Sequence, residues 1–178
     1  LPHSHPSPSF PFYRGLGSHL GILMWVTSGA IAVTTSLLGP RDGRDHETSR
    51  LLLGAGLFGM TLGLDDLFLL HEVVLPSLGI AEWAVFLAYG LALTTGIVME
   101  RRAVMTTEFS LLALAGALFG LAVLVDEGPE MGLPLLWRLG HSPLEDVVKI
   151  VAIAVWSLYL VRTAFHRMCE GRRSTTPD

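Results

Sequence analysis

Five apolar runs, each long enough to cross a lipid bilayer, constrain this chain of 178 residues more than any other feature. About 20 helical residues, rising 1.5 Å each, cross the hydrocarbon core of a membrane. Only 16% of the residues are charged, whereas a soluble domain carries about 25%. The sequence therefore predicts an all-α polytopic bundle with five transmembrane helices, which cover residues 20–38, 51–70, 83–99, 109–125 and 144–161.

The arginines predict the orientation of this bundle. Nine arginines flank one side of the five runs, and only Arg14 and Arg138 flank the other. Because positively charged loops stay in the cytoplasm, we expect the N-terminus outside the cell and the C-terminus in the cytoplasm. The nine are Arg41, Arg44, Arg50, Arg101, Arg102, Arg162, Arg167, Arg172 and Arg173.

The sequence predicts one transmembrane domain between two short terminal segments. Residues 1–18 contain four prolines before position 12 and are predicted to form an extended outer arm. Residues 19–166 form the transmembrane domain, and residues 167–178 form a cytoplasmic tail. The single cysteine, Cys169, excludes an intrachain disulfide, and one lysine with a net charge of −4 excludes a nucleic-acid partner. The lipid bilayer is therefore the expected surrounding of most of the chain.

Two local patterns refine the helices. Ser49 precedes the second run and is predicted to cap the N-terminus of its helix, which can extend as far as Pro76. Small residues recur every four positions, for example Gly59 and Gly63 in the second run and Gly116 and Gly120 in the fourth. Such spacing lets helices pack closely in a membrane, so we expect a compact bundle.

The second run ends in an unusually polar segment, which contains Asp65, Asp66, His71 and Glu72. Carboxylates inside a transmembrane segment are costly and generally mark a partner or a functional site. On a continuous helix, Asp65 and Glu72 would share one face, whereas Asp66 and His71 would flank it on opposite sides.

A second polar segment opens the fifth run and contains His141, Asp146 and Lys149. Lys149 lies six residues inside Pro143, about 9 Å below the outer boundary, and Asp65 lies at a similar depth. A lone lysine in hydrocarbon needs a counter-charge. We therefore predict an ion pair between Lys149 and either Asp65 or Asp66.

Three functions fit these residues. In the first, an outward-facing site binds zinc, manganese or iron and activates water to hydrolyse a lipid or another amphiphile. In the second, Asp–Lys pairing holds an accessory subunit in a larger complex or in a self-associated form. In the third, the charges form a path for protons or cations. The candidate catalytic residues are Asp65, Asp66, His71 and Lys149, and the candidate metal ligands are Asp65, Asp66, His71, Glu72, His141 and Asp146.

The segments Asp65-Asp66-Leu67-Phe68-Leu69-Leu70-His71-Glu72 and Glu145-Asp146-Val147-Val148-Lys149 resemble those of a group of small polytopic prokaryotic membrane proteins. This resemblance implies a shared outer site and a location in the prokaryotic cytoplasmic membrane. The chain is more loosely similar to ceramidase-like membrane hydrolases, whose pattern combines Ser, Asp and several His around zinc. That similarity implies roles for Asp65, Asp66 and His71, although the HxxxH pair of those hydrolases is missing here.

Overall fold

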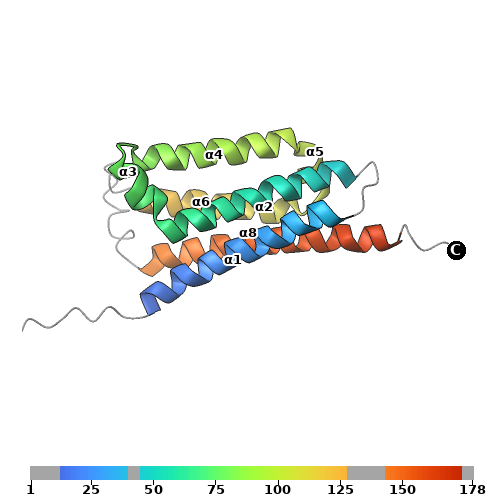
Figure 1. The fold of residues 1–178 in the computed structure, drawn as a ribbon, viewed down its shortest axis with the longest axis horizontal. Helices are drawn as coiled ribbons and strands as arrows, with labels where there is room; N and C mark the ends of the chain where they lie inside the picture. The colour runs from blue at the N-terminus through green and yellow to red at the C-terminus, as the bar shows by residue number, and fades with distance from the viewer. Residues whose placement is uncertain (1–12, 40–44, 128–142, 174–178) are drawn as a thin grey trace, which may run out of the picture.

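The computed structural model describes residues 13–39, 45–127 and 143–173, and within these ranges every regular element is a helix. Five long helices run alternately in opposite directions along the bundle (Figure 1). Each is long and apolar enough to cross a membrane, so the prediction of an all-α protein with five candidate transmembrane helices is confirmed. They are α1 (Tyr13–Leu38), α2 (Asp45–Phe68), α4 (Glu82–Met99), α6 (Phe109–Glu127) and α8 (Pro143–Arg173).

Three short elements connect the long helices. The π-helical turn η1 (Leu70–Val74) and α3 (Leu75–Ser77) join α2 to α4 at one end of the bundle, and α5 (Arg101–Thr106) joins α4 to α6 at the other end. Figure 1 shows α3 and α5 at these opposite ends. The predicted extension of the second helix to Pro76 was therefore wrong, because α2 ends at Phe68.

The first and last helices are longer than the apolar runs from which they were predicted. Helix α1 begins at Tyr13, inside the predicted arm, and α8 continues to Arg173, so the predicted tail from residue 167 begins within this helix. The prediction that Ser49 caps α2 was also wrong, because α2 begins at Asp45. The Ser49 hydroxyl instead donates a hydrogen bond across to the carbonyl of Ser36 on α1, at 2.9 Å.

The core lies where α1, α2, α6 and α8 meet. The ring of Trp25 on α1 stacks on Phe119 of α6, with centroids 5.4 Å apart, and meets Trp156 of α8 edge-on at 6.0 Å. Gly59 and Gly63 on α2 make room for these rings, because a Cβ atom at Gly63 would lie 2.9 Å from the Cβ of Trp25. The small residues of α2 therefore serve helix packing, whereas Gly116 and Gly120 face open space.

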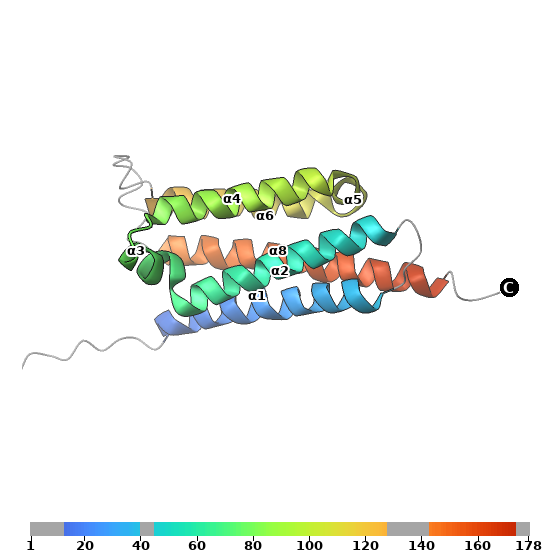
Figure 2. The same cartoon turned by 45° about the horizontal axis from the view of Figure 1, so that its top comes forward.

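Helix α4 lies at the edge of the bundle, on the opposite side from α1 (Figure 2). Only 6% of its most apolar 18-residue segment is buried, compared with 44% of the corresponding segment of α8. Its exposed side chains include Trp83, Leu87 and Leu91. Exposed apolar side chains of this kind are typical of a helix at the edge of a bundle that spans a membrane.

Candidate functional site

The backbone breaks between α2 and η1, and this break builds the site. Leu69 adopts a left-handed conformation, with φ of 51° and ψ of 44°. For a residue with a Cβ atom this conformation costs about 1–2 kcal/mol. The amide of Val74 then bonds to the carbonyl of Leu69 across a wide π turn, at 3.2 Å. The chain direction changes so sharply that His71 returns toward the last turn of α2.

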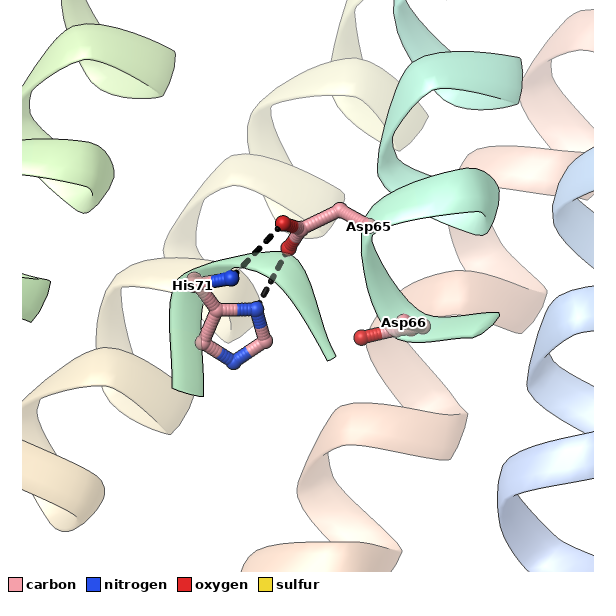
Figure 3. A group of neighbouring side chains, drawn as sticks. All are labelled: Asp65, Asp66 and His71. Carbon is pink, nitrogen blue, oxygen red and sulfur yellow. Dashed lines mark hydrogen bonds and ion pairs between the residues drawn. The ribbon is translucent and has the colours of Figure 1, made fainter. Parts of the chain in front are cut away.

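Asp65 and His71 form a buried pair as a result (Figure 3). The Nδ1 atom of His71 lies 2.5 Å from Oδ2 of Asp65, and the backbone amide of His71 donates to Oδ1 of the same carboxylate at 3.0 Å. The side chain of Tyr89, on α4, lies near the same carboxylate. Both oxygens of this carboxylate, which is only 3% exposed, therefore bond to His71.

The imidazole of His71 is enclosed on its other sides. The ring of Phe86 on α4 lies 5.2 Å away, centroid to centroid. The Nε2 atom of His71 lies 4.0 Å from Oε1 of Glu82. The hydrogen bond to Asp65 raises the pKa of His71 above its ordinary value, although burial acts in the opposite direction. The pair thus favours the imidazolium form and fixes the ring plane.

Asp66 belongs to a second pair, between α2 and α8. The Lys149 ammonium donates to Oδ1 of Asp66 at 2.8 Å, which confirms the prediction that Lys149 pairs with one of these two aspartates. The Asp66 carboxylate is largely enclosed, whereas the lysine side chain is 45% exposed. The pair therefore lies at the edge of the bundle, with the lysine side chain partly accessible.

The two pairs adjoin. One ligand atom from each of Asp65, Asp66 and His71 lies within 4.8 Å of the others. Asp65 and Asp66 lie at the end of the second candidate span and Lys149 lies near the start of the fifth, whereas His71 lies just beyond the spans. The cluster thus combines carboxylate and imidazole groups at one end of the apolar region.

The other predicted ligands are not in this cluster. Glu72 is exposed beside His71, and Asp146 is exposed on α8. His141 lies outside the described residues. The prediction that Asp66 and His71 diverge was wrong, because it assumed a continuous helix through Leu69.

Sequence reasoning missed Glu82 and Tyr89, which both approach the cluster from α4. Glu82 could have been found, because it opens the third apolar run on the side predicted to contain His71. Tyr89 gave no such signal, since a tyrosine within a transmembrane run is typical of ordinary helix packing.

No curated protein and no solved structure matches this chain significantly. Residues 4–163, which include the aspartates, His71 and Lys149, match the model of a family described as a domain of unknown function, DUF8692. The chain belongs to the DUF8692 family.

Proposed function

We propose that Asp65, Asp66 and His71 bind a divalent transition metal, which activates water to hydrolyse an ester or amide bond in a lipid or another amphiphile. The observation that carries this proposal is the convergence of the three ligand atoms within 4.8 Å of one another. Mixed carboxylate and imidazole ligands suit zinc, manganese and non-haem iron. Three protein ligands also leave a coordination position for water.

For the pair of Asp65 and His71, metal binding requires a small adjustment. Ligands on one metal, at bonds of about 2.0–2.2 Å, lie about 3 Å or more apart. The Nδ1 atom of His71 and Oδ2 of Asp65 are 2.5 Å apart, so these two atoms would have to move about 0.5–1 Å farther apart to bind one metal. The backbone amide of His71 would keep its bond to Oδ1 of Asp65 and limit the movement.

Lys149 fits the same proposal as a supporting charge. Its bond to Oδ1 of Asp66 leaves Oδ2 of that carboxylate available to a metal. The Lys149 ammonium and a divalent cation would both favour an anionic reaction intermediate close to them. The lysine side chain is partly exposed, so its ammonium can approach such an oxyanion.

The two alternative functions have less support. The Asp66–Lys149 pair neutralises two charges within one chain, so neither is left over for pairing with another subunit. A proton path needs ionisable groups along the bundle. In the described spans, Asp, Glu, Lys, Arg and His occur only near the two ends.

Metal analysis of the full chain, purified in detergent, tests the proposal. We expect about one equivalent of metal, and at least a tenfold weaker affinity in His71→Ala and Asp66→Asn. Glu72→Gln is the matched control, because Glu72 is an exposed acid adjacent to His71. Unchanged metal content in His71→Ala, or no metal after loading a folded protein with zinc, manganese or iron, contradicts the proposal.

The hydrolytic step needs its own assay. Metal-loaded protein is incubated with ester- and amide-linked amphiphiles in mixed micelles, and the released acyl group is measured. We expect release to stop on chelation, to return on reloading, and to be unaffected by Glu72→Gln. A stoichiometric metal with no release from either linkage would reject hydrolysis of these two linkages while leaving the metal site intact.

A further inference from the structure

A second site lies at the end of the bundle opposite the Asp65–His71 pair. An apolar cavity of about 260 Å³ opens between α2, α4, α6 and α8. Its walls include Phe58 on α2, Ile97 on α4 and Trp156 on α8. Because α4 is barely buried, this cavity lies behind a helix that faces lipid.

Glycines keep the cavity open. Gly54 on α2 and Gly96 on α4 both line it, and a Cβ atom at either position would meet no other atom within 4 Å. Protein interiors are normally packed without voids, and an apolar cavity does not retain water well. Within a bilayer, lipid acyl chains are the apolar groups available to fill such a cavity.

The mouth of the cavity is charged. Arg50 and Glu100 line both this cavity and a neighbouring polar one of about 250 Å³. They form an ion pair, with Nε of Arg50 3.1 Å from Oε1 of Glu100. The polar cavity thus adjoins the apolar one at this ion pair and provides space for a polar head group.

The polar cavity has an excess of positive charge. Arg50, Arg101 and Arg102 line it together with Glu47 and Glu100, which leaves one net positive charge. Arg102 is only loosely paired, 3.9 Å from Glu47, and Arg101 has no ion-pair partner among the described residues. Guanidinium groups bind phosphate oxygens through paired hydrogen bonds.

We propose that these two cavities together bind one anionic phospholipid, with an acyl chain in the apolar cavity and its phosphate beside Arg101 and Arg102. Basic pockets between transmembrane helices on the cytoplasmic side are typical sites for anionic head groups. The positive-inside rule predicts that this end of the bundle faces the cytoplasm. The site is separate from the proposed metal site and does not depend on it.

Lipid binding to the full chain, purified in detergent, tests the proposal. Phosphatidylglycerol, phosphatidylethanolamine and phosphatidylcholine with identical acyl chains are added, and bound lipid is measured by native mass spectrometry. We expect phosphatidylglycerol to bind about tenfold more tightly than the two zwitterionic lipids. Equal binding of all three would overturn the assignment of an anionic head group.

Variants separate the two halves of the site. Gly54→Leu and, independently, Gly96→Leu should fill the apolar cavity and reduce phosphatidylglycerol binding at least fivefold, whereas Gly116→Leu, which also has open space around it but does not line the cavity, should not. The double variant Arg101→Gln and Arg102→Gln should remove the preference for phosphatidylglycerol. Using two cavity variants and a head-group variant keeps the test valid if one of them fails to fold.

A soluble competitor distinguishes a lipid site from a simple phosphate site. Glycerol phosphate should not displace phosphatidylglycerol at millimolar concentration, because the acyl chain contributes most of the affinity. Displacement by glycerol phosphate, or unchanged lipid binding in both folded cavity variants, would overturn the proposal that an acyl chain occupies the cavity.

Discussion

The Lys149 ammonium and Oδ1 of Asp66 lie 2.8 Å apart, although 83 positions separate these residues in the chain. The bond joins the last turn of α2 to the first turns of α8. It therefore fixes the relative positions of the two helices at the end of the bundle that contains the proposed metal site.

We predict that this pair stabilises the fold measurably. Lys149→Met and Asp66→Asn should each lower the free energy of unfolding. Their coupling in a double-mutant cycle should be about 1–2 kcal/mol, between the values for exposed and buried pairs, because the lysine is 45% exposed. Unfolding in detergent by a denaturing surfactant measures the free energies of unfolding of the wild-type protein, the two single variants and the double variant. Asp146→Asn, on the exposed part of α8, is the control, and its coupling to Lys149 should not exceed about 0.5 kcal/mol, the value for opposite charges three residues apart on one helix.

The stability of the metal-free protein should depend on pH through His71. Its pKa is raised in the folded state by the hydrogen bond to Asp65, so protonation favours folding. This stabilisation is complete below the unfolded pKa of about 6.5 and is lost as the pH rises through the higher folded pKa.

Unfolding with a chelator present, from pH 6 to pH 9, measures this dependence. The free energy of unfolding should fall more in the wild-type protein than in His71→Gln. Equal slopes in the two proteins would mean that the bond between His71 and Asp65 does not favour the imidazolium.

Leu69 should be replaceable by glycine with a gain in stability. Its left-handed backbone costs about 1–2 kcal/mol with a side chain, and glycine adopts that conformation freely. We expect Leu69→Gly to raise the free energy of unfolding by about 0.5–1 kcal/mol, after the entropy lost by glycine on folding is subtracted. The matched control, Leu67→Gly, lies within α2 and should lower it by about 1 kcal/mol. Loss of stability in Leu69→Gly would argue against the break in the helix.

Arg167 should contribute to stability from the opposite end of the bundle. This residue is 4% exposed, and its guanidinium donates to the carbonyl of Thr35, near the end of α1, at 2.8 Å. Arg167→Met leaves that carbonyl without this donor and should cost about 1–3 kcal/mol. Arg162→Met removes a half-exposed arginine that pairs with Glu108, and it should cost less than about 1 kcal/mol. The same surfactant unfolding compares them, and equal losses would contradict the prediction.

The orientation predicted from the arginines can be measured by labelling. Ser77 and Met105 are exposed at opposite ends of the bundle, beside α4. After Cys169 is replaced by serine, an impermeant thiol reagent added to intact cells should label Ser77→Cys and leave Met105→Cys unlabelled. The reverse pattern would place the Asp65–His71 pair on the cytoplasmic side.

The sequence predicted most of the fold because apolar length alone identifies helices that can cross a bilayer. Lys149 was matched to the aspartates of the second run because a buried charge at a known depth has few possible partners. The pairing of His71 with Asp65 could not be predicted in this way. It depends on one left-handed leucine, and leucine carries no signal for that conformation. The contact with Glu82 depends on the same change of direction.

The break at Leu69 also makes the length of the segment from Asp65 to His71 more important than its composition. Leu67 and Phe68 are both exposed, so their side chains can change without disturbing the pair, whereas position 69 must tolerate a left-handed backbone. One residue added to or removed from this segment would displace the imidazole from the carboxylate, because the single left-handed residue sets where the chain turns back. Relatives that use the same site should therefore vary in sequence at positions 67 and 68 and keep the length of the segment fixed.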